Sequence, residues 1–119
     1  MNNRNPKPYD LEERTLEFAK AVIRLCKKLS KNTINNELVA QVVRSSGSVG
    51  ANYREANESL SKKDFVYRIK ICRKEAKEIH YWLQLILEAN PDFAQEIKEL
   101  VQEALELKKI FSSIVGKSE

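Results

Sequence analysis

Apolar residues recur at every third or fourth position through four long segments of the chain, which is the spacing of one buried face of an α-helix. The segments are residues 10–30, 36–59, 62–89 and 91–115. Nowhere do apolar and polar residues alternate as they do in a half-buried strand. The first stripe is Leu11, Thr15, Phe18, Val22, Leu25 and Leu29, and the second is Leu38, Val42, Ser45, Val49, Tyr53, Ala56 and Leu60. The pattern therefore predicts an all-α chain.

Short polar junctions separate these segments and carry residues that begin and end helices. The expected caps are Asn35 or Asn36 for the second helix and Ser61 with Asp64 for the third. Gly116 is expected to end the fourth helix. Short links between long helices favour antiparallel neighbours, so the expected fold is an antiparallel up-down-up-down four-helix bundle. The expected parts are a flexible leader (1–9), the bundle (10–115) and a polar tail (116–119).

The second segment contains a run of small residues between Ser45 and Asn52, including Gly47 and Gly50. Such a run can be a loop. The apolar stripe stays in phase on both sides of it, and this favours one continuous helix. Each glycine costs a helix about 1 kcal/mol relative to alanine, so we expect a neighbouring helix to approach closely here.

The net charge of the 119-residue chain is +4, and it is unevenly distributed. Residues 1–87 hold 17 Lys and Arg against 10 Asp and Glu, a balance of +7, whereas residues 88–119 hold 4 against 7, a balance of −3. A basic surface is therefore expected in the first three quarters of the chain. No apolar run approaches the roughly 20 residues of a membrane span, and no signal peptide is visible, so a cytoplasmic protein is expected.

Cysteine and histidine are too scarce for a structural zinc site, which usually takes four such ligands. The chain has only Cys26, Cys72 and His80. Buried free thiols in a reducing cytoplasm are the expected state of both cysteines. No phosphate-binding loop, dinucleotide-binding, zinc-protease or calcium-binding motif is present. Neither a metal nor a cofactor is therefore expected.

The segment from Arg44 to Ala56, with Ser61-Lys62-Lys63-Asp64-Phe65 ahead of a long helix, resembles a known family. That family is the bacterial four-helix bundle proteins first noted as reading frames inside intervening sequences of large-subunit ribosomal RNA genes. The accessory variability determinant proteins of diversity-generating retroelements look like its relatives. The similarity is strongest from Ser48 to Glu55, although Gly50 stands where the family commonly has proline.

The resemblance implies a bundle that assembles as a ring-shaped homopentamer without established enzyme activity. In the retroelement branch it also implies a basic surface that binds nucleic acid and a reverse transcriptase. The sequence leaves open which branch applies. Separately, the first helix has a second apolar face that includes Leu16 and Ile23, and this surplus indicates a contact between subunits.

Basic residues are concentrated on the first and third predicted helices, with few acids among them. Both clusters can lie on one outer surface, and a symmetric oligomer would multiply it. Such a surface would bind nucleic acid in a salt-sensitive way, because each neutralised phosphate releases counterions. An ordinary solvated face is the alternative. The residues expected to bind RNA or DNA are Lys20, Arg24, Lys27, Lys28, Lys31, Arg73, Lys74 and Lys77.

Polar residues form a second stripe beside the core of the second helix. One hypothesis is a structural network of hydrogen bonds that fixes the register of helices or subunits. The other is a catalytic carboxylate at Glu55, which would need a nucleophile, a second carboxylate or a metal, and none is suitably spaced. The structural hypothesis is therefore favoured. The predicted structural polar network is Arg44, Ser48, Asn52 and Glu55.

The aromatic residues of the third segment, among them Tyr81 and Trp82, are expected mainly to fill a core or an interface. Alternatively, Tyr53, Tyr67 and Tyr81 stack on single-stranded bases beside the basic residues. The sequence thus indicates a non-catalytic homo-oligomeric scaffold that binds nucleic acid with little sequence specificity, with a reverse transcriptase as a candidate partner. A protein–protein interaction adaptor is the alternative, and a hydrolase that uses Glu55 is the third hypothesis.

Overall fold

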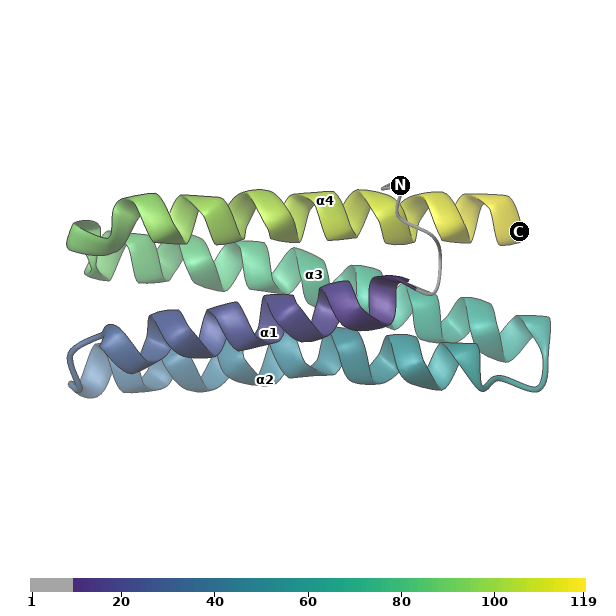
Figure 1. Cartoon of the computed structure of the whole chain (residues 1–119), viewed down its shortest axis with the longest axis horizontal. Helices are drawn as coiled ribbons and strands as arrows, with labels where there is room; N and C mark the ends of the chain where they lie inside the picture. The colour runs from purple at the N-terminus through teal and green to yellow at the C-terminus, as the bar shows by residue number, and fades with distance from the viewer. Residues whose placement is uncertain (1–9) are drawn as a thin grey trace, which may run out of the picture.

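The computed structural model describes residues 10–119, and the expected leader, residues 1–9, lies outside that range. The main helices are α1 (Asp10–Lys28), α2 (Thr33–Asn57), α3 (Lys62–Ala89) and α4 (Ala94–Ser118), and a short 3-10 helix, η1 (Pro91–Phe93), precedes α4. Figure 1 shows the four long helices lying along the longest axis of the molecule. No strand occurs between residues 10 and 119, so the prediction of an all-α fold is confirmed.

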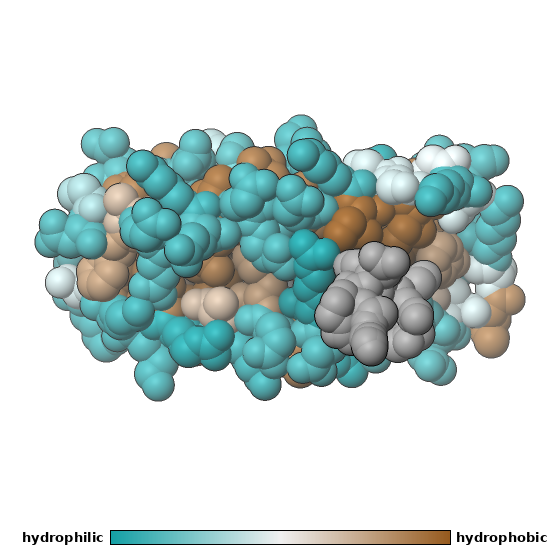
Figure 2. Space-filling view, turned by 45° about the horizontal axis from the view of Figure 1, so that its top comes forward, coloured by the Kyte–Doolittle hydropathy of each residue, from teal (hydrophilic) through white to brown (hydrophobic). Residues whose placement is uncertain are grey.

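The helices pack in chain order, and each runs antiparallel to the one before it (Figure 1). The pairs α1–α2, α2–α3 and α3–α4 make the larger contacts, whereas α1 and α4 meet only briefly. The diagonal pairs α1–α3 and α2–α4 have no close backbone approach. The predicted up-down-up-down four-helix bundle is therefore confirmed. Its least closed side is the seam between α1 and α4, where Figure 2 shows apolar side chains reaching the surface among hydrophilic ones.

The apolar stripes of the four helices meet in one core. The rings of Tyr53 on α2 and Phe111 on α4 lie 6.1 Å apart between centroids, so side chains meet across a diagonal whose backbones do not. Among residues 10–119, none of the helices combines the length and apolar composition that a membrane crossing requires. The largest fully buried side chains include Val22, Leu25, Val42, Val49, Ile69, Ile79, Leu83, Ile86, Ile97, Leu107 and Phe111.

The first residues of α2 differ from the prediction. Asn32, rather than Asn35 or Asn36, caps the helix, since its side-chain oxygen accepts a hydrogen bond of 2.8 Å from the Asn35 N–H. Asn35 is itself buried, and its side-chain amide exchanges hydrogen bonds of 3.1 and 2.9 Å with the amide of Asn90. This amide pair ties the start of α2 to the residue that follows α3.

The end of α2 also differs. The helix stops at Asn57, and the backbone N–H groups of Glu58 and Ser59 donate to the carbonyls of Glu55 and Ala56, each at 3.1 Å. This tighter turn takes the chain out of helical phase. Leu60, which the apolar stripe placed in the core, is consequently fully exposed.

The fourth helix continues to Ser118, so it does not end at Gly116 and the last residues are not a separate tail. The Ser118 hydroxyl donates to the Ile114 carbonyl at 2.7 Å. The Glu119 carboxylate forms an ion pair of 2.9 Å with Lys70 on α3. These contacts stabilise the last turn of α4. A glycine close to the end of a helix usually predicts that the helix stops there, and it gives no sign of such contacts.

The run of small residues lies within α2, as predicted, and the close approach of a neighbouring helix is confirmed at one glycine. A Cβ atom built on Gly50 would lie 3.1 Å from the Thr15 hydroxyl oxygen on α1. Thr15 is fully buried, and its hydroxyl donates to the Leu11 carbonyl at 2.7 Å. A Cβ on Gly47 would meet nothing within 4 Å. The approach of α1 to α2 is therefore tight at Gly50 and not at Gly47.

Candidate nucleic-acid interface

The outward side of α3 carries lysines and tyrosines in one continuous row. Their spacing of four and three residues in turn keeps them on one face of the helix, opposite the buried Ile69, Cys72 and Ile79. All six side chains are exposed, and the row extends for about 27 Å at the rise of an α-helix. We call this row the Lys–Tyr face, and it consists of Lys63, Tyr67, Lys70, Lys74, Lys77 and Tyr81.

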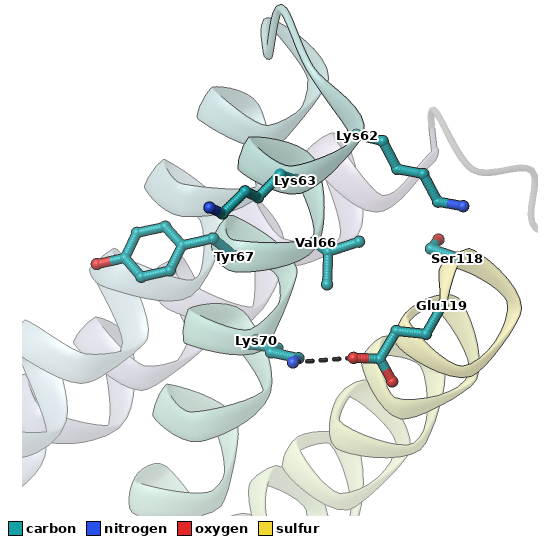
Figure 3. A pocket seen from close by; sticks show the side chains of 7 residues that line it. All are labelled: Lys62, Lys63, Val66, Tyr67, Lys70, Ser118 and Glu119. Atoms are coloured by element: carbon teal, nitrogen blue, oxygen red, sulfur yellow. Dashed lines mark ion pairs between the residues drawn. The ribbon is translucent and has the colours of Figure 1, made fainter.

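The beginning of the Lys–Tyr face lies beside the end of α4 (Figure 3). Lys63 and Tyr67 point away from α4, whereas Lys62 points towards its last residues. Lys70 forms the 2.9 Å ion pair with Glu119, and this hydrogen bond lowers the pKa of the Glu119 carboxyl. Because both partners are largely exposed, water and salt screen the pair, and a phosphate can take the place of the carboxylate.

The charge of the Lys–Tyr face is only partly neutralised. Within residues 10–119, Lys63 and Lys77 have no ion-pair partner, and Lys74 lies 4.0 Å from Glu78. Glu78 is shared with Arg44 of α2, at 3.5 Å. The face therefore keeps a net positive charge, which is greatest at Lys63 and Lys77, and such a charge attracts a polyanion.

The basic side chains predicted on the first helix are more strongly neutralised by nearby acids than those of the Lys–Tyr face. Lys28 is held by Glu96 of α4 at 2.6 Å, and Lys20 lies 3.3 Å from Glu17. Arg24 shares a shallow pocket with Glu96 and Glu99, so acids of α4 offset its charge. Lys31 follows the end of α1 and does not continue its helical face, which corrects the predicted alignment of this cluster.

The two predicted basic clusters do not share one surface. They lie on α1 and α3, which are diagonal partners in the bundle, so their outward faces point in different directions. Of the predicted residues, Lys74 and Lys77 belong to the Lys–Tyr face, and the half-buried Arg73 flanks it. Lys63 and Lys70 were missing from the predicted set, whereas Tyr67 and Tyr81 were predicted only in the alternative hypothesis of stacking on bases. Their regular spacing along one helix was the signal that could have found them.

The predicted polar network is divided between two groups, each completed by α3. Asn52 donates to the Ser48 hydroxyl at 3.0 Å and accepts from Arg68 at 3.1 Å. Arg44 instead reaches Glu75, at 3.6 Å, and Glu78. These side chains join α2 to α3, in keeping with a structural role.

Glu55 belongs to neither group. Its side chain is exposed and makes no hydrogen bond or ion pair with any part of the chain that the structure describes. Among residues 10–119 there is therefore no buried partner that would make this carboxylate structurally important. Glu75 is the buried carboxylate here, 6% exposed, and its Oε1 atom lacks a hydrogen-bond partner among residues 10–119.

Residues 10–119 offer neither an activated thiol nor a cluster of metal ligands. Burial raises the pKa of Cys26 to about 11 and that of Cys72 to about 12, so both thiols are protonated at neutral pH. No group of three or more His, Cys, Asp or Glu side chains between residues 10 and 119 is placed to hold a metal ion. Tyr53 is buried, so it cannot stack on a base as one hypothesis required, whereas Tyr67 and Tyr81 are exposed.

These observations define a small four-helix bundle with a basic, partly aromatic outer face on α3. A family model described as 23S rRNA-intervening sequence protein matches residues 8–113, and the chain belongs to this family. The resemblance inferred from the segment at Arg44–Ala56 is thereby confirmed. Comparison with curated protein sequences finds no match.

A solved structure supports the same assignment. It is a protein of unknown function from the S23 ribosomal protein family of Bacteroides thetaiotaomicron, with 31% sequence identity and a TM-score of 0.78. The match covers 87% of this chain and 96% of the other. Neither this description nor that of the family names a catalytic activity.

Proposed function

We propose that this chain is a non-catalytic, homo-oligomeric scaffold that binds nucleic acid through the Lys–Tyr face with little sequence specificity. The observation that carries the proposal is the row of four exposed lysines along about 21 Å of one helix. Lysine ammonium groups meet phosphates as point charges, and phosphate contacts carry no sequence information.

Binding by such a face follows from the exchange of weak ion pairs for phosphate contacts. Lys63 and Lys77 are available without breaking any ion pair of the described chain, and the exposed pairs of Lys70 and Lys74 are readily exchanged. Each contact releases counterions from the nucleic acid, so affinity falls as salt rises. Residues 10–119 form no helix-turn-helix or zinc finger that could read bases in a groove of the nucleic acid. We therefore expect the protein to discriminate poorly between nucleic-acid sequences.

Reversing Lys63 and Lys77 to Glu is expected to weaken binding about tenfold or more and to lower the salt slope by about two, one for each lost phosphate contact. The measurement is fluorescence anisotropy with labelled RNA and DNA at about 50 and about 200 mM salt. The matched control is Lys27→Glu with Lys31→Glu, which changes the net charge equally on the α1 side. Circular dichroism of both variants verifies that the helices remain.

The outcomes separate the candidate functions. A larger loss from the α3 variant supports the Lys–Tyr face, and equal losses would show that only the net charge matters. If the unaltered protein binds neither RNA nor DNA at the lower salt concentration, the proposal is wrong and the protein-interaction adaptor replaces it.

The oligomeric part of the proposal is supported by apolar side chains that the single bundle leaves exposed. Leu16 and Ile23, two turns apart on α1, are 38% and 45% exposed. Replacing both with Ser is expected to shift the protein from an oligomer, a pentamer by family resemblance, to the 13.8 kDa monomer. Light scattering at micromolar concentration measures this, with Ile34→Ser as the exposed-apolar control. A monomeric mass for the unaltered protein would refute the oligomer.

A further inference from the structure

We infer that the Lys–Tyr face takes single-stranded nucleic acid, whose unpaired bases stack on Tyr67 and Tyr81 while the lysines between them hold the backbone. This inference rests on the proposed function and specifies its ligand. Tyr67 is 60% exposed and Tyr81 is 58% exposed, and both lie on the same helical face as the four lysines. Tyr53, in contrast, is buried in the core.

Exposed tyrosines among lysines favour unpaired bases over a duplex. An aromatic ring stacks on any base whose face is free, whatever its identity, whereas the bases of a duplex are already stacked on their neighbours. Lysines alone would bind both forms through phosphates. The tyrosines therefore add affinity only for the single strand, without adding sequence specificity.

The surroundings of Tyr81 fit a base-stacking position. Its ring meets Trp82 edge-on, with centroids 5.2 Å apart and an interplanar angle of 71°, and this contact restrains its orientation. The two rings line one shallow pocket together with Lys74, Lys77, Glu78, His80 and Gln84. A base on Tyr81 would therefore lie beside cationic groups that can receive its phosphates. Trp82 is the only tryptophan in the chain, so its fluorescence reports on this position.

The separation of the two tyrosines sets a minimum length for the ligand. Fourteen residues of helix place their backbones about 21 Å apart. At about 3.4 Å per phosphate along a stacked strand, this distance corresponds to about six nucleotides. A strand of about four nucleotides can reach only one ring, and one of about twelve can reach both, within the range of known single-strand sites.

The experiment compares single strands and duplexes of the same sequence and length with the full chain. The unaltered protein is expected to bind a single strand of about twelve nucleotides at least tenfold more tightly than the duplex, and far more tightly than a strand of about four. Tyr67→Ala with Tyr81→Ala should remove this preference by lowering the affinity for the single strand to about that for the duplex. Tyr67→Phe with Tyr81→Phe keeps the rings and should keep the preference. Trp82 fluorescence should respond to the single strand and not to the duplex.

Each result has a distinct meaning. Binding to neither form refutes the proposed function itself. Equal affinity for both forms, unaffected by the alanine variants, refutes the single-strand inference and leaves phosphate binding intact. A lower mass of the alanine variant in light scattering would assign the tyrosines to a subunit contact and would also overturn the inference.

Discussion

Replacing Phe111 with Ala is expected to destabilise the bundle by about 3–5 kcal/mol, through lost burial and the cavity left behind. Phe111 is fully buried on α4, and its ring meets that of Tyr53 on α2. The backbones of α2 and α4 do not approach each other, and this ring pair is one place where side chains of the two diagonal helices meet.

Urea unfolding followed by circular dichroism measures this loss. Domains of this size have stabilities of about 5–15 kcal/mol, so the variant should unfold at a much lower urea concentration. Phe93→Ala is the matched control, because Phe93 lies in η1 and is only half-buried. It should be clearly less damaging. A loss below about 1 kcal/mol for Phe111→Ala would show that the surrounding side chains collapse into the space.

The helices could be predicted from the sequence because burial repeats with the period of the helix. The apolar stripe through Val42, Val49 and Tyr53 stays in phase across the run of small residues, and in the structure this run is part of the continuous helix α2. The ends were less predictable, because several neighbouring residues can cap. Asn32 and Asn35 could both cap α2, because their side chains are identical. In the structure Asn32 is the cap, and Asn35 is buried because its side-chain amide pairs with that of Asn90.

The candidate site was predictable only within a single helix. Charge density identified Lys74 and Lys77, but the placement of α1 diagonal to α3 is a property of the assembled bundle. The partners of the polar residues on α2 also lie on another helix and could not be predicted from local spacing. Asn52, for example, accepts a hydrogen bond from Arg68 on α3. Local spacing predicts a shared face, whereas pairing between helices depends on tertiary packing.

Replacing Gly50 with Val is expected to destabilise the fold by about 1–3 kcal/mol, the usual effect of overpacking a core. The new Cβ would lie 3.1 Å from the Thr15 hydroxyl oxygen and 3.5 Å from its Cβ, before the two added methyl groups are counted. Thr15 has no room to yield, because it is fully buried and its hydroxyl is bonded to the Leu11 carbonyl. The helix α1 must therefore move away from α2.

Gly47→Val is the matched control, since it makes the same substitution three residues earlier in the same helix, where an added Cβ meets nothing within 4 Å. Valine has a higher helix propensity than glycine, so this variant should be as stable as the unaltered protein or slightly more stable. Thermal unfolding of the two variants side by side separates packing from propensity. Equal midpoints would mean that α1 and α2 are not in close contact at Gly50, whereas a lower midpoint for Gly50→Val alone ties the loss to the contact with Thr15.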